Sequence, residues 1–141
     1  GGKTDVIMML NGALAGLVAI TAEPLTPSPL AAIFIGAIGA IIMYFGTKML
    51  EGFGLDDVVG AIPVHMFAGI FGTLIVPATN GDTSFGTQFV GVLSVVLFSF
   101  VLSYAVFVAL KATIGLRVSK EAERLGTDKA EIGVQAYAIR D

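Results

Sequence analysis

The chain contains no cysteine, which excludes disulfide bonds, thiolate metal sites and a thiol nucleophile. It is also poor in charge, since 13 % of its residues are Asp, Glu, Lys or Arg, whereas soluble proteins contain about 25 %. Histidine is nearly absent, because His65 is the single one. Metal sites and enzymatic acid–base pairs therefore lack their usual residues, and we expect no metal, no cofactor and no enzymatic activity.

What the sequence does contain is long apolar runs. Hydrophobic residues make up 55 % of the chain, and the mean hydropathy is +0.89. Four stretches without Asp, Glu, Lys or Arg are each long enough, or nearly so, for a helix that spans a bilayer, which takes about 20 residues. We therefore predict an all-α integral membrane protein with a transmembrane part at residues 1–114 and a tail at 115–141. The predicted spans are 6–22, 30–50, 57–78 and 87–114.

The basic residues predict the orientation. With four spans, both termini and the loop between the second and third spans lie on one side of the membrane. Every Lys and Arg falls on that side: Lys3, Lys48, Lys111, Arg117, Lys120, Arg124, Lys129 and Arg140. The two opposite loops carry only Glu23 and Asp82. The positive-inside rule therefore places both termini in the cytoplasm. No basic patch lies outside the tail, and no nucleic-acid partner is predicted.

The segment 55–76 carries most of the chemical information. Asp56 and Asp57 stand where the third span begins, and at least one of them is expected to cap the free N–H groups of that helix. Pro63 lacks an N–H, so we expect it to leave the carbonyl of Val59 unpaired. The same proline should kink the helix two residues before His65.

His65 lies eight residues after Asp57, which at about 1.5 Å per residue is about 12 Å into a hydrocarbon core about 30 Å thick. An ionisable side chain at that depth is costly and usually faces a cavity or a partner, so it marks a candidate functional site. A purely structural histidine, hydrogen-bonded to another helix, is the alternative. Small residues on the same helical face leave room beside the ring: Ala61, Ala68, Gly69 and Gly72.

The first span carries a stripe of small residues that lets another helix approach closely: Gly12, Ala15, Gly16 and Ala19. Asn11 is its one strong hydrogen-bonding side chain, for which an interhelical hydrogen bond and a place in a pore are both open. In the tail, Ser119 followed by Glu121 and Glu123 predicts a capped helical turn. Because the chain starts at Gly1 without an initiator Met, we expect it to be a piece of a longer protein.

Three segments, in this order along the chain, carry a family resemblance. The first is residues 11–21, and the second is Asp56-Asp57 with Gly60, His65 and Gly69. The third is residues 115–118 with Gly126, Asp128, Gly133, Ala136 and Tyr137. Together they resemble the ammonium transporter family (Amt/MEP/Rh) in its bacterial branch, over nearly the whole chain.

The resemblance implies a fold of eleven transmembrane helices, of which this chain is similar to the last four plus the cytoplasmic tail. It implies that His65 is the second of two pore histidines and that Asn11, Leu14 and Ala61 face the pore. Ammonium would lose a proton and cross as ammonia through an apolar channel, for nitrogen uptake. The implied setting is a homotrimer in the lipid bilayer of the inner (plasma) membrane, with a PII-type regulator as a partner of the tail.

Three other functions stay open on the sequence. A Rhesus-type channel passes neutral gas without net charge. An ammonium sensor uses a transporter-like membrane part and signals through its tail. A packing module transports nothing and has no accessible cavity beside His65.

Overall fold

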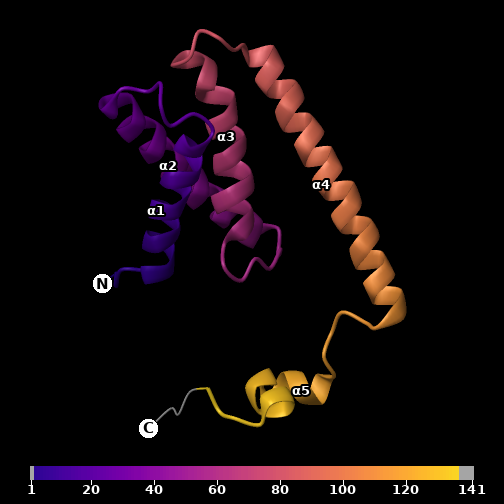
Figure 1. Cartoon of the computed structure of the whole chain (residues 1–141). Helices are drawn as coiled ribbons and strands as arrows, with labels where there is room; N and C mark the ends of the chain where they lie inside the picture. The colour runs from indigo at the N-terminus through magenta and orange to yellow at the C-terminus, as the bar shows by residue number, and fades with distance from the viewer. Residues whose placement is uncertain (1, 137–141) are drawn as a thin grey trace. The chain divides into compact units, whose positions relative to one another are not determined.

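A computed structural model describes residues 2–136, which form helices joined by short loops and no strand (Figure 1). This confirms the predicted all-α class. The α-helices are α1 (Val6–Thr21), α2 (Pro29–Gly52), α3 (Ala68–Ile75), α4 (Phe85–Thr113) and α5 (Lys120–Leu125). Three short segments of other helical types are π-helical Ile62–Phe67, 3-10 helical Val76–Ala78 and π-helical Asp128–Ile132. Tyr137 of the tail motif and Arg140 lie outside the described residues.

Each of the four apolar stretches forms a helix. Two of these helices, α2 with 24 residues and α4 with 29, are long and apolar enough to cross a membrane. Shorter apolar helices cover Val6–Thr21 and Ile62–Ala78. The helix within the predicted span 57–78 begins at Ala61, because the residues just before it form a turn. No residue of α4 is buried, as suits a helix that is apolar on all sides and meets lipid or other helices.

Side-chain caps explain where the helices start. The Asp5 carboxylate accepts a hydrogen bond from the Met8 N–H (3.0 Å) at the start of α1. Ser28 does the same for the Ala31 N–H at the start of α2, where Pro29 holds the first helical position. Ser119 caps α5 through the Ala122 N–H, which confirms the turn predicted from the sequence.

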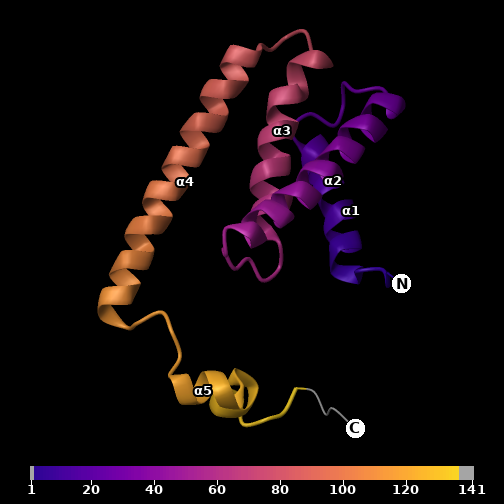
Figure 2. The same ribbon diagram turned by 180° about the vertical axis from the view of Figure 1, so that it is seen from behind.

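The chain divides into two units, and the boundary between them lies within α4, between Leu97 and Phe98. In the first unit, α1, α2 and α3 pack side by side (Figures 1 and 2). The helices approach closely because glycines and alanines stand at their crossings. A Cβ on Gly16 would lie 3.2 Å from the Gly36 carbonyl oxygen, and one on Gly39 would lie 2.6 Å from the Ala19 Cβ. The small-residue stripe of the first span is therefore a packing surface for α2.

The first unit has a small apolar core formed by Ala15, Met43, Val64 and Ala68. The contacts between α1 and the segment 60–72 follow the same order in both segments. They run from Asn11 with Gly60 to Val18 with Gly69 and Ala19 with Gly72. Helices α1 and α3 therefore run parallel, and α2 runs antiparallel to α1. This pairing sets which residues of α1 lie level with His65.

A polar contact joins two loops of the first unit. The Asn80 side-chain amide donates to Glu23 (3.1 Å), and Glu23 also accepts from the Leu25 N–H (3.2 Å). This contact links the loop after α1 to the loop after α3.

The second unit includes the end of α4, helix α5 and the tail. Gly126 at φ 96° ends α5, and Gly133 at φ 75° ends the next π-helical segment, both in conformations that favour glycine. The Asp128 carboxylate accepts a hydrogen bond from the Ala136 N–H (2.8 Å), which closes a loop of the tail. This bond, with a second from the Lys129 N–H, holds the pKa of Asp128 below its ordinary value of 3.8.

We expect this tail loop to open in acid. Because the folded-state pKa is lowered, the carboxylate stabilises the loop above pH 3.8, and this stabilisation is lost as the pH falls through the lowered pKa. Ala136→Pro removes the N–H donor and should return the Asp128 pKa toward 3.8, as measured by carbon NMR titration of labelled Asp. Val134→Ala keeps every backbone N–H and is the matched control. Equal titration in the wild type and Ala136→Pro would contradict the expectation.

Gly72 tests the close contact between α1 and α3. A Cβ at this position would overlap the backbone carbonyl of Ala19, so Gly72→Ala should lower the unfolding free energy of the protein by about 1–3 kcal/mol through overpacking. The measurement is thermal unfolding in detergent. Gly91→Ala in α4 is the control, since its Cβ meets nothing within 4 Å. Equal melting temperatures for the two variants would show that the helices do not meet as closely as described.

Candidate functional site

The candidate site begins at the turn that precedes the π-helical segment Ile62–Phe67. The two carboxylate oxygens of Asp57 accept hydrogen bonds from the N–H groups of Ala61 (2.9 Å) and Ile62 (2.8 Å). These are two of the N–H groups at a helix start that have no partner inside the helix. Asp56 is exposed, and no side-chain hydrogen bond of Asp56 is found among the described residues. The two neighbouring carboxylates therefore differ in their surroundings.

Pro63 lies in the first helical turn and not in the helix interior that the sequence suggests. The helix begins at Ala61, and the first N–H bonded to the backbone at this end is that of Val64, which donates to the Gly60 carbonyl (3.1 Å). A proline is tolerated in the first turn because its missing N–H would have had no helical partner there. Pro63 therefore breaks no helical hydrogen bond of α3.

The irregular backbone around His65 is π-helical. The segment Ile62–Phe67 contains His65, and the Ala68 N–H that follows donates to the carbonyls of His65 and Pro63. Such wider turns are rare and occur often at functional sites, because they change the direction in which one side chain points. Within the segment, Pro63 and Val64 are buried and His65 is exposed.

His65 and two of the other predicted pore residues are exposed on the first unit. Leu14 is 49 % accessible, and Ala61 and His65 are both exposed. Ala61 and His65 are four residues apart on one helical face, and Asn11 and Leu14 are three apart on another. Because Asn11 contacts Gly60, beside Ala61, and the two helices run parallel, Leu14 stands about level with His65. The four residues thus form two successive layers: Asn11 with Ala61, and Leu14 with His65.

Asn11 is partly buried and bound to the turn. Its side-chain amide donates to the Val59 carbonyl (3.0 Å), across 48 positions of sequence. The sequence predicts an unpaired Val59 carbonyl and, separately, an interhelical hydrogen bond of Asn11; the structure joins the two. Gly60, between Val59 and Ala61, has a φ of 71°. The sequence alone does not predict this left-handed turn, although a glycine directly before an apolar helical run is a usable signal.

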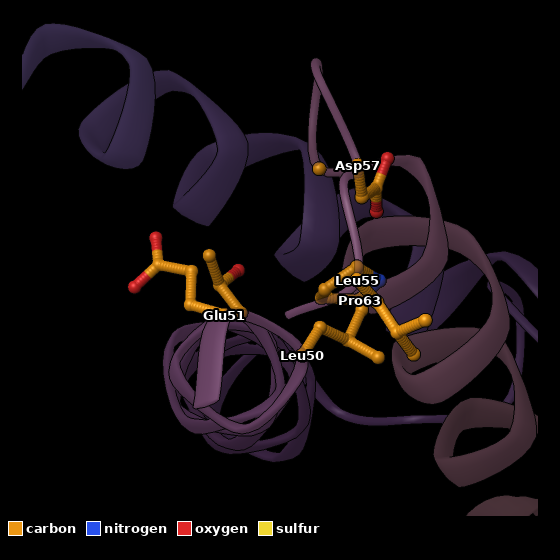
Figure 3. Close-up of a pocket in the computed structure, with 7 residues that line it drawn as sticks. Leu50, Glu51, Leu55, Asp57 and Pro63 are labelled. Carbon is orange, nitrogen blue, oxygen red and sulfur yellow. The ribbon is translucent and has the colours of Figure 1, made fainter. Parts of the chain in front are cut away.

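A small open pocket lies beside this turn, toward the end of α2 (Figure 3). Its volume is about 40 Å³, and its lining residues are Thr47, Leu50, Glu51, Leu55, Asp57, Gly60 and Pro63. Its polar groups are already engaged, since Glu51 pairs with Lys48 (2.9 Å) and Asp57 caps the helix. None of the predicted pore residues lines this pocket. Within residues 2–136, no three His, Cys, Asp or Glu side chains gather as a metal site requires.

Comparisons with known proteins identify the family of this chain. The model of the Ammonium Transporter Family matches residues 1–137. Ammonium transporter Amt2 of Archaeoglobus fulgidus is 41 % identical, over 96 % of this chain and 33 % of that protein. Ammonium transporter Amt2 of Methanocaldococcus jannaschii is 34 % identical over 96 % of this chain and 34 % of that protein, and the ammonium transporter of Aquifex aeolicus is 33 % identical over 98 % and 36 %.

The chain therefore spans about one third of the length of the relatives it matches. Its apolar helices agree with the membrane location of a transporter. Since the family model covers all but the last four residues, this chain belongs to the Ammonium Transporter Family.

Proposed function

We propose that the protein to which this chain belongs transports ammonium across a membrane, and that the substrate passes beside His65. The observation that carries this proposal is the position of His65. It is the chain's one histidine, it interrupts an apolar span, and it is exposed beside a buried core. The relatives are about three times as long, so their further helices are available to cover this face and enclose a path.

The surroundings of His65 suit a neutral molecule better than a cation. Leu14 and Ala61 supply apolar surface, and the nearest acidic group in the sequence, Asp57, is engaged with backbone N–H groups. A whole cation loses much hydration energy in such a setting. Ammonium avoids this loss by giving up a proton and crossing as ammonia, whereas potassium has no proton to give up. The route therefore selects ammonium over potassium.

The imidazole of His65 contributes hydrogen bonds along this route. A neutral imidazole has one donor and one acceptor nitrogen, so it can bind ammonia or hold the tautomer of a second ring. It can also pass a proton separately from the ammonia. Asn11 lies beside Gly60, in the same layer as Ala61, and in the proposed orientation this layer is on the cytoplasmic side of His65.

The wider setting follows from charge and from the family. Every basic residue is on one side of the predicted spans, which favours cytoplasmic termini in the inner membrane of the cell. We propose a homotrimer as the working form and a PII-type regulator as a partner of the tail. The loop closed by Asp128 and Ala136 is an ordered part of that tail and a surface for such a contact.

Replacing His65 tests the proposal. In proteoliposomes of the full-length protein, His65→Ala should lower ammonium flux about tenfold or more, or remove the discrimination against potassium; tenfold corresponds to about 1.4 kcal/mol in the barrier. Thr73→Val is the matched control, because Thr73 is the next polar side chain of the same span. Among residues 2–136, its hydroxyl bonds only to Gly69 of its own helix (2.9 Å). This control should transport like the wild type.

Three outcomes would overturn parts of the proposal. Unchanged flux and selectivity in His65→Ala would remove His65 from the route. Ammonia flux without any proton-linked step would favour the neutral gas channel of the Rhesus type. Ammonium binding with no flux in the wild type would favour a sensor.

A further inference from the structure

We propose that Asn11 is a positioning residue, which fixes His65 by holding the turn at Val59 and Gly60. The inference rests on the proposed function of His65 and goes beyond it, because it assigns Asn11 a task other than contact with the substrate. The hydrogen bond from the Asn11 amide to the Val59 carbonyl is its central observation.

The Val59 carbonyl has no donor in the turn that follows it. The N–H groups of Ala61 and Ile62 are bound to Asp57, Pro63 has no N–H, and the Val64 N–H binds the Gly60 carbonyl. Val59 is 66 % exposed, so at the start of this apolar span its carbonyl without a protein partner would depend on water alone. Asn11 supplies the missing donor from another helix, so the turn is completed only when α1 is in place.

Gly60 allows this contact for two reasons. Its φ of 71° is a conformation that residues with a Cβ rarely adopt. A Cβ at Gly60 would also lie 2.6 Å from the Asn11 amide nitrogen and would push it away from Val59. The turn and the side chain of Asn11 therefore fit one another, and the pairing depends on both residues.

The same contact fixes the position of His65. The other contacts between α1 and this part of the chain are apolar and non-directional, such as Ala15 with Val64 and Ala68 in the core. The Asn11 hydrogen bond is directional and holds Val59 in place. The next residue, Gly60, accepts a hydrogen bond from the Val64 N–H, so the position of the turn also fixes Val64, one residue before His65. Loss of the Asn11 amide should therefore let the start of the π-helical segment shift and move the imidazole.

A direct contact between Asn11 and ammonia is the competing explanation. It uses the same residue on the same face, but it makes different predictions. A positioning residue acts through His65, so its removal has little further effect once His65 is gone. A substrate contact acts independently, so the two losses multiply.

The test is a double-mutant cycle in proteoliposomes of the full-length protein, with ammonium flux as the readout. Asn11→Leu removes the amide and keeps the side chain large, and we expect a loss of about threefold or more in flux or in ammonium-over-potassium selectivity. In the His65→Ala background the same change should cost less than about twofold, because coupled residues are not additive. Thr21→Val is the matched control on α1, since within the part of the chain that the structure describes the Thr21 hydroxyl bonds only to Leu17 of its own helix.

A second readout does not depend on transport. The carbon NMR signal of a labelled Val59 carbonyl should shift in Asn11→Leu and stay in place in Thr21→Val, because a carbonyl that loses its hydrogen bond changes its chemical shift. If Asn11→Leu does not assemble, Asn11→Ala takes its place in both measurements. Failure of both variants to fold while Thr21→Val folds would make Asn11 a purely structural residue and overturn the proposal.

The outcomes separate this inference from the proposed function. Wild-type flux in His65→Ala sinks the proposed function, and the role assigned to Asn11 with it. A loss in His65→Ala combined with wild-type flux in Asn11→Leu, an unmoved Val59 signal, or losses that multiply would overturn only the role of Asn11. A moved Val59 signal together with non-additive losses supports it.

Discussion

The structure around His65 depends on one constraint, the need of the backbone polar groups at the start of an apolar helix to find partners in the turn 57–63. Asp57 takes two N–H groups, and Asn11 supplies a donor to Val59. Pro63 contributes no N–H that would need one. With these groups bound, the chain enters an apolar helix, although its first part is π-helical and not regular α-helix.

Close helix packing positions that local arrangement within the candidate site. Glycines and alanines at the crossings let α1 approach both α2 and α3, and the approach is close enough that a Cβ on Gly72 would overlap the Ala19 backbone. Since α1 and α3 run parallel, Leu14 comes level with His65 while Val64 and Ala68 face the core. Packing thus leaves the imidazole exposed on one face of the segment, while Val64 and Ala68 on the other face are buried in the core.

Membership of the Ammonium Transporter Family supports ammonium transport in general, and the proposed function assigns this exposed face to the route of the substrate. An exposed histidine in an apolar helix would be unfavourable in a complete membrane protein if it faced lipid. In a chain that spans about a third of its relatives' length, the same face is available to further helices. In the proposed function a small, neutral, hydrogen-bonding molecule passes beside the imidazole. Such a molecule suits the apolar surface of Leu14 and Ala61 and needs no free carboxylate nearby, since Asp57 is bound to backbone N–H groups.

The sequence by itself determined the helical class, the approximate positions of the apolar helices, the lone histidine and the cap at Ser119, because these depend on hydrophobic runs and on residues close together in the chain. It also pointed to Asp57, Pro63 and Asn11 without giving their partners. Only the tertiary structure decided that Asn11 meets Val59 and that Gly60 makes a left-handed turn. It alone showed that Pro63 stands in a first turn and His65 in a π-helical segment. The physical reason is that a hydrogen bond across 48 positions depends on how two helices pack, which no local pattern of residues records.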